Sequence, residues 1–161
     1  MPRSIRLRES RSHLDVQVDL LDDLAPENAE LLWQIAGIAR AHEAIHAMWT
    51  GPEISCPIFG SALPDPERTL NIPLENATSY PAAGEIATVF ARRGTWKGMP
   101  EADFFDIGLF YGDGARLLMP MGWIMGSVCA RIAPADLADF QQACRTIRRQ
   151  GACELTFVRN A

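Results

Sequence analysis

The sequence lacks the features that mark several large classes of protein. No apolar run approaches the roughly 18 residues that a membrane-spanning helix needs. The N-terminus shows no apolar signal-peptide stretch, so we expect a cytoplasmic location by default. The net charge is -5 with both signs mixed along the chain, which gives no broad basic face. We therefore expect neither a membrane nor a nucleic acid as partner.

Cysteine is also scarce, and the four cysteines form no C-x-x-C pair. Three of them lie inside apolar patterns, which is typical of small core residues. They are Cys56, Cys129, Cys144 and Cys153. The hydrophobic content of 48% in 161 residues suits one globular domain, spanning residues 1–161, with a substantial core.

Alternating apolar and polar residues predict strands at the N-terminus. Ile5 and Leu7 alternate with arginines, and apolar residues alternate with polar ones from Leu14 to Leu20. The mixed charges of residues 3–11 favour a solvated edge strand over a phosphate-binding site.

Two segments carry helix patterns. Pro26 suits the first position of a helix, which we expect to end near Gly37 and Ile38. Pro134 begins a second helix that extends to Arg149, with apolar residues at helical spacing.

The remaining chain predicts short strands. Residues 50–100 are rich in Gly and Pro, which argues against helix there. We expect strands over residues 72–74, 85–91, 104–111, 116–119, 127–132 and 153–158. Gly112-Asp113-Gly114 predicts a hairpin turn between the strands at 104–111 and 116–119. Many short strands with two helices predict a mainly β protein, a closed or nearly closed β-barrel with helices at its ends.

The string from His42 to His46 matches the H-E-x-x-H pattern of zinc peptidases, which bind zinc only when the string lies on a helix. On a strand the two histidines would lie about 13 Å apart, at ~3.3 Å per residue, and no single ion would join them. Because Gly37 should end the preceding helix, we predict no metal site. A zinc-dependent hydrolase using His42, Glu43 and His46 remains the alternative.

Five segments carry a resemblance that covers nearly the whole chain: Ala25–Glu27, His46–Glu53, Glu75–Pro81, Gly84–Ile86 and Phe110–Gly112. In these the chain resembles an uncharacterised family of bacterial and archaeal proteins of unknown function, whose structural members have a cyclophilin-like fold. The resemblance implies a cyclophilin-like closed β-barrel with two helices and a pocket, but no reaction and no cofactor. It departs at Arg92-Arg93-Gly94, where relatives more often carry Pro-Gly. Prolyl isomerase activity would rest on the fold alone, because the sequence shows no match to the catalytic arginine pattern of true cyclophilins.

The polar residues near these segments predict a ligand pocket at the mouth of the barrel. The six expected ligand-binding residues are His46, Trp49, Glu75, Asn76, Tyr80 and Tyr111. The aromatic groups would supply stacking, and Glu75 and Asn76 would orient a small polar metabolite. Glu75 or His46 is the candidate general base if the protein is an enzyme. On this hypothesis Glu75→Gln weakens ligand binding and leaves the melting temperature nearly unchanged.

Structural explanations exist for the same residues. The stretch from Glu75 to Tyr80 also suits a polar turn, and His46 suits a strand histidine bonded to a backbone carbonyl. Asp103 and Asp106 are interpreted as outward-facing strand residues.

The third alternative for the protein is an interaction module without catalysis. Four Trp and six Met exceed what one small core readily hides, so we expect a homo-oligomer.

Overall fold

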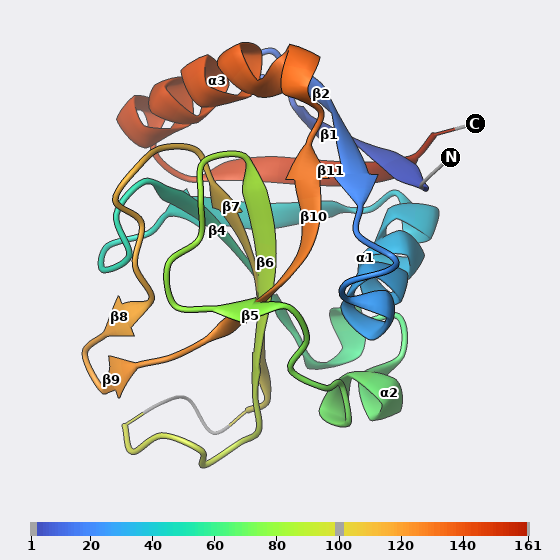
Figure 1. The fold of residues 1–161 in the computed structure, drawn as a ribbon, viewed down its shortest axis with the longest axis vertical. Coiled ribbons are helices and arrows are strands. Elements are labelled where there is room, and N and C mark those ends of the chain that lie inside the picture. The colour runs from blue at the N-terminus through green and yellow to red at the C-terminus, as the bar shows by residue number, and fades with distance from the viewer. Residues whose placement is uncertain (1–2, 99–101, 161) are drawn as a thin grey trace.

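The computed structural model describes residues 3–98 and 102–160. The last two residues of the Gly- and Pro-rich segment at 50–100, residues 99 and 100, lie outside the described residues. Eight strands form a closed antiparallel barrel in the order β2-β1-β11-β3-β4-β7-β6-β10, and β10 pairs with β2 to close it (Figure 1). Their bounds are β1 Ser4–Glu9, β2 Leu14–Leu20, β3 Ala41–His46, β4 Glu53–Phe59, β6 Glu85–Ala91, β7 Phe104–Phe110, β10 Gly126–Ile132 and β11 Cys153–Arg159. The short strand β5, Ala77–Thr78, adds to β10. The predicted mainly β barrel is confirmed.

The two predicted long helices are present. Helix α1 spans Pro26–Ile38 and packs against β10 and β11, while α3 spans Leu137–Gln150 and packs against β2 and β3 across one end of the barrel (Figure 1). Ala39 follows α1 in the left-handed conformation, with φ 53°. The chain therefore leaves α1 just before β3 begins.

A third helix appears where the sequence argued against one. Helix α2, Pro66–Leu70, follows a 3-10 turn at Gly60–Ala62. The Asp65 side chain accepts a hydrogen bond from the backbone N–H of Arg68, and Pro66 occupies the first turn. Both are helix-start features, and the overall Gly and Pro content of the segment concealed them. Residues 72–74, expected as a strand, are irregular.

Two predictions of strand pairing are wrong. β7 pairs with β4 and β6, not with residues 116–119. Instead β8, Leu118–Met119, pairs with β9, Gly122–Trp123. The N-terminal strand β1 is not an edge strand, because it lies between β2 and β11. Closure of the barrel gives β1 and β7 a partner on each side, and local sequence patterns do not report such distant pairings.

The core fills the barrel interior. Alternate residues of each strand point inward, as Ile54, Cys56 and Ile58 of β4 do, and each is at most 2% exposed. All four cysteines are buried and free. Among the described residues, no helix is long and apolar enough to cross a membrane.

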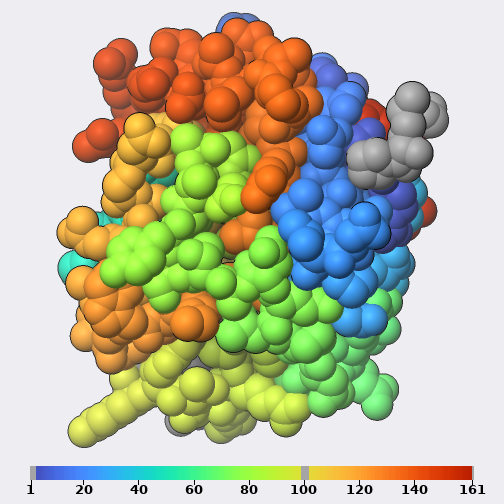
Figure 2. All heavy atoms as spheres, in the orientation of Figure 1, coloured from blue at the N-terminus to red at the C-terminus, as the bar shows by residue number. Residues whose placement is uncertain are grey.

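Several large apolar side chains remain on the surface. Tyr80 and Trp123 contact each other with ring centroids 5.3 Å apart, and Met125 is also exposed. Figure 2 shows the surrounding segments, green for residues 75–85 and orange for residues 118–126, side by side on one face. The homo-oligomer stays a prediction, and exposed apolar side chains such as these are where its contacts would be expected.

Candidate functional site

The histidine string lies on strand β3, Ala41–His46, and not on a helix. His42 and His46 are therefore about 13 Å apart, at ~3.3 Å per residue. The His42 ring is buried against Phe157, with centroids 6.4 Å apart. This geometry rules out one zinc ion held by both histidines, so the alternative of a zinc hydrolase built on this string is wrong. Within residues 3–98 and 102–160, no group of three or more His, Cys, Asp or Glu side chains is placed to hold a metal ion.

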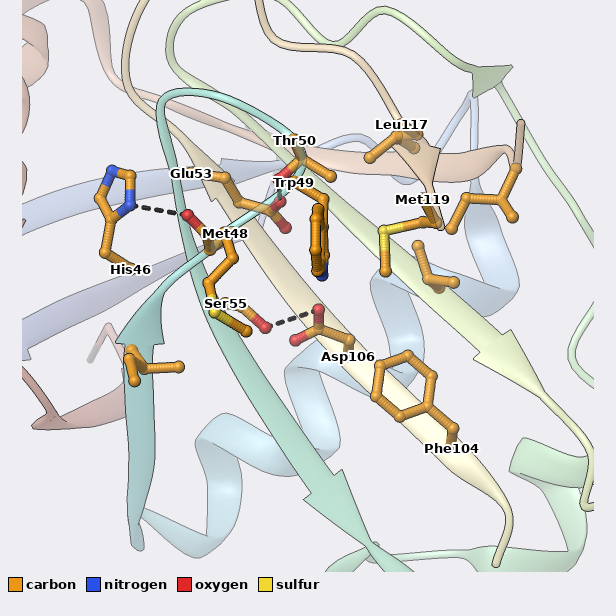
Figure 3. A pocket seen from close by; sticks show the side chains of 14 residues that line it. His46, Met48, Trp49, Thr50, Glu53, Ser55, Phe104, Asp106, Leu117 and Met119 are labelled. Carbon is orange, nitrogen blue, oxygen red and sulfur yellow. Dashed lines mark hydrogen bonds between the residues drawn. The ribbon is translucent and has the colours of Figure 1, made fainter. Parts of the chain in front are cut away.

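A cavity of about 180 Å³ lies on the outer face of the barrel, over β3, β4, β7 and β6. Figure 3 shows it from close by, with Glu53, Ser55 and Asp106 at the floor and Trp49 beside them. Most of the other lining side chains are apolar, among them Phe104 and Met119. The site is thus an apolar cavity with a few polar groups at its base, as ligand pockets commonly are.

The alternation of the strands shows that this face points away from the barrel interior. In β4, Ile54 and Cys56 enter the core, so Glu53 and Ser55 face outward. In β7, Phe105 and Ile107 enter the core, and Asp106 faces outward in the same way. This cavity therefore lies on the outer face of the barrel and not at the predicted barrel mouth, and the interpretation of Asp106 as outward-facing is correct.

Two segments that lie far apart from each other in the sequence cover this outer face and turn it into a cavity. The loop at residues 47–52 leads from β3 to β4, and residues 117–124 include β8 and β9. Backbone bonds hold them in place: the N–H of Arg116 donates to the Thr50 carbonyl at 3.0 Å, and that of Leu117 donates to the Ser79 carbonyl at 2.8 Å. Without this cover the floor carboxyl groups would be in solvent.

Glu53 and Asp106 form a pair of buried acids, only 4% and 9% exposed. The Thr50 hydroxyl donates to Glu53, and the Ser55 hydroxyl donates to Asp106 Oδ2 at 2.8 Å. The second oxygen, Asp106 Oδ1, is buried and has no hydrogen-bond partner among the described residues. An orphaned carboxylate oxygen is costly, so its presence beside a cavity points to a partner that is not part of the chain.

Burial changes the protonation of this pair. It raises the pKa of Asp106 to about 6, although hydrogen bonds from Ser55 and from the backbone of Cys56 and Ile107 act in the opposite direction. Burial, together with the nearby charge of Asp106, raises the pKa of Glu53 to about 8. Both shifts go in the same direction and belong to the pair, so near neutral pH the two carboxyl groups share one proton and bear one negative charge between them.

Gly108 of β7 makes room for the Glu53 side chain. A Cβ atom at Gly108 would lie 2.4 Å from Glu53 Oε1 and 2.9 Å from the Phe110 ring. Glycine at this position therefore allows the carboxyl group to lie close to the strand.

The structure brings together three of the six predicted ligand-binding residues. His46 and Trp49 line the cavity, and Tyr111 lies behind His46. The Nε2 atom of His46 is 2.7 Å from the Tyr111 hydroxyl, and its Nδ1 is 2.8 Å from the Ala47 carbonyl oxygen. Since a carbonyl only accepts, Nδ1 carries the proton and Nε2 accepts from Tyr111. Burial lowers the pKa of His46, which favours this neutral form.

The other three predicted residues lie elsewhere. Glu75 Oε2 accepts hydrogen bonds from the backbone N–H groups of Glu27 and Asn28, both at 3.1 Å, and from Asn28 Nδ2 at 2.7 Å. It caps α1, whose own N-cap residue Ala25 offers no side-chain acceptor. Asn76, with φ 43°, donates to the Val128 carbonyl oxygen.

Tyr80 is 67% exposed, and its ring contacts that of Trp123 at an interplanar angle of 44°. The predicted convergence of six residues on one cavity is therefore wrong, because unpaired N–H groups of α1 attract Glu75 and a turn engages Asn76. Ligand binding by His46, Trp49 and Tyr111 stays a prediction.

Sequence reasoning missed Glu53 and gave Asp106 little weight. A signal was available, since Asp106 interrupts the apolar run from Phe104 to Phe110. An acidic residue inside such a run indicates a strand whose second face is also covered. Residues 47–52 and 117–124 cover that face, and the second of these segments begins 11 residues beyond Asp106 in the sequence.

Removing the Tyr111 hydroxyl should remove the hydrogen bond that this group donates to His46 Nε2. We expect Tyr111→Phe to lower the free energy of unfolding by about 1 kcal/mol, because it removes one buried hydrogen bond to His46 Nε2. Urea denaturation measures the change. Tyr80→Phe is the matched control, since Tyr80 is exposed. Equal losses in the two variants would contradict the buried bond.

Comparison with known proteins supports the fold. None of the curated proteins matches the chain. Among solved structures, that of McbB in complex with tryptophan is similar with a TM-score of 0.66 and 16% identity over 98% of this chain, which spans 45% of the McbB chain. A cyclophilin-type peptidyl-prolyl cis-trans isomerase of Cryptosporidium parvum is similar with a TM-score of 0.51 and 12% identity, covering 99% of this chain and 98% of that one. At these identities the likeness shows the fold alone, and it confirms the cyclophilin-like barrel.

The sequence itself matches one family model over most of its length, from residue 8 to residue 159. This agrees with the predicted membership of a family of unknown function with a cyclophilin-like fold. The chain belongs to DUF3830, a family of proteins of unknown function.

Proposed function

We propose that this protein binds a small organic molecule in the cavity beside Trp49, with an apolar body against the walls and a polar group at Glu53 and Asp106. The observation that carries the proposal is Asp106 Oδ1, a buried oxygen without a hydrogen-bond partner among the described residues, at the floor of an apolar cavity. A ligand that donates a hydrogen bond there would remove the cost of leaving it unpaired.

The size and walls of the cavity limit the ligand. An apolar protein cavity of about 150 Å³ holds benzene, so about 180 Å³ suits one aromatic ring with a short substituent. Trp49, 53% exposed, stands at the rim, and Phe104 and Met119 offer further apolar contact (Figure 3). The ligand is thus less polar than the metabolite that the sequence suggested.

The proposal is for binding and not for prolyl isomerisation. The isomerase of Cryptosporidium parvum shares the fold at 12% identity, which transfers no activity. The described residues that line the cavity include no arginine. McbB was solved with tryptophan, a compound with an aromatic body and polar groups, and tryptophan is therefore one of the compounds to test.

Saturation-transfer NMR tests the proposal with tryptophan, phenethylamine, phenylethanol and phenylpropanoate. We expect at least one of them to bind the wild-type protein. Val89→Phe should abolish that binding, because Val89 lines the cavity and a phenyl ring would occupy it.

Val158→Phe is the matched control, since Val158 is a half-buried residue of β11 outside the cavity. Circular dichroism identifies which variants fold. If none of the four compounds binds, or if a folded Val89→Phe binds them as the wild type does, the cavity is not the binding site. Should Val89→Phe fail to fold, Trp49→Ala replaces it, because Trp49 is exposed at the rim; undiminished binding by that variant would also count against the proposal.

A further inference from the structure

We propose that the ligand is an organic cation, an amine whose ammonium group lies between Glu53 and Asp106 while its apolar body contacts Trp49 and Phe104. The inference rests on the proposed function and adds the chemical class of the molecule. It is carried by three features of the site: two adjacent buried acids, an unpaired carboxylate oxygen, and a shortage of positive charge around them.

The first step is the charge around the pair. Neither Glu53 nor Asp106 takes part in any ion pair found among the described residues. Among the described residues that line the cavity, the remaining ionisable group is His46 of β3, and its two ring nitrogens are engaged by Ala47 and Tyr111 in the neutral form.

Groups on neighbouring elements do not neutralise the pair either. Cys56 of β4 is buried, and burial raises the pKa of its thiol, so it stays neutral. Arg148 of α3 acts on His46 and Tyr111, but it is not among the groups that shift Glu53 or Asp106. A buried negative charge without a cation is costly, and a bound ammonium group would offset that cost.

The second step is the geometry of donors and acceptors. An ammonium group has up to three N–H donors and no acceptor, which matches a floor made of oxygens. Asp106 Oδ1 is free to accept, while Oδ2 is engaged by Ser55 (Figure 3). Hydrogen bonds between an ammonium and a carboxylate are stronger than neutral ones.

The third step separates an organic cation from a metal ion. A metal ion would need several oxygen ligands in place of its water shell, whereas most of the lining residues are apolar. An amine with an aromatic or aliphatic body uses both parts of the site. The faces of Trp49 and Phe104 also attract cations.

Three ligands with the same ring test the charge. We expect phenethylamine to bind the wild-type protein at pH 7.5 at least roughly tenfold more tightly than phenylethanol, since charged hydrogen bonds contribute more than neutral ones. Phenylpropanoate should bind most weakly, because its carboxylate meets a negative floor. Isothermal titration calorimetry measures all three.

Asp106→Asn provides the matched variant. Asparagine keeps the shape and can still accept the hydrogen bond from Ser55, but it removes the charge. We expect phenethylamine affinity to fall roughly tenfold or more, while phenylethanol affinity changes little. Glu53→Gln should lower phenethylamine affinity only where Glu53 is ionised, above about pH 8.

The pH dependence gives a check that needs no variant. Phenethylamine stays protonated below about pH 9, as alkyl amines do. Its affinity for the wild-type protein should therefore fall as pH drops from 7.5 to 5 and Asp106 takes up a proton at about 6. Asp106→Asn should remove that fall.

The outcomes separate this inference from the proposed function. Equal affinities for phenethylamine and phenylethanol would overturn the inference of a cationic ligand and leave small-molecule binding in place. An equal loss of affinity for both compounds in Asp106→Asn would do the same. If none of the compounds binds, the proposed function itself fails. If Asp106→Asn does not fold, the pH dependence and the three-ligand comparison in the wild type decide the question.

Discussion

Replacing Glu53 with glutamine should make the protein more stable than the wild type at pH 8 and leave its stability nearly unchanged at pH 4.5. Glu53 is almost fully buried, and in the folded protein its pKa is raised from 4.5 to about 8. The ionised carboxylate is therefore less favourable in the folded state than in the unfolded chain. Glutamine removes the ionisation and can still accept the hydrogen bond from Thr50.

The sign follows from the direction of the shift. Below pH 4.5 Glu53 is protonated in both the folded and the unfolded state, so it does not lower the free energy of unfolding. Between pH 4.5 and pH 8 the unfolded chain releases the proton first, so wild-type stability declines by up to about 1.4 kcal/mol per pH unit from this group. The difference between the free energies of unfolding of variant and wild type should reach about 4 kcal/mol at pH 8.

The two histidines of β3 act on both proteins alike. Burial lowers the pKa of His42 and His46, which reduces stability as pH falls below 6.5. Because both histidines are present in the variant, their contribution cancels in the difference. Urea denaturation across pH 4.5 to 8 measures it.

The control is Glu43→Gln, the same change at an exposed position of β3. A Glu53→Gln protein with the pH profile of the wild type, or one less stable than the wild type at pH 8, would show that Glu53 is ionised at no cost. The protonation assigned to the acid pair would then be wrong.

Replacing Glu75 with alanine should lower the free energy of unfolding by about 2 kcal/mol at pH 7. The substitution removes a carboxylate that accepts from the backbone N–H groups of Glu27 and Asn28 and from the Asn28 side chain. Hydrogen bonds to a charged group contribute about 1.5–3 kcal/mol, and a lost helix cap costs a similar amount. Ligand affinity should not change, because Glu75 does not line the cavity.

This expectation reverses the one drawn from the sequence, in which Glu75 bound the ligand and contributed little to stability. Chemical denaturation measures the loss, and Glu43→Ala is the control for removing an exposed glutamate. A Glu75→Ala protein of wild-type stability whose phenethylamine affinity is lost would restore the sequence-based hypothesis.

The sequence by itself determined the local structure. Pro26 marked the start of α1 and the helix ended at Ile38, so the histidine string fell on strand β3. The alternating pattern of residues 14–20 became β2. These features depend on backbone angles and on side chains a few residues apart, which the sequence states directly. The resemblance added the cyclophilin-like barrel, which the solved structures confirm.

Only the tertiary structure decided the site. Periodicity places Asp106 on the outer face of β7, but it does not report that residues 117–124 cover that face. It places Glu75 in a polar stretch, but not against the start of α1, which is 47 residues away along the chain. The reason is the same in both cases. A pattern shows which residues share a face, whereas burial, orphaned oxygens and shifted pKa values depend on what distant parts of the chain bring to it.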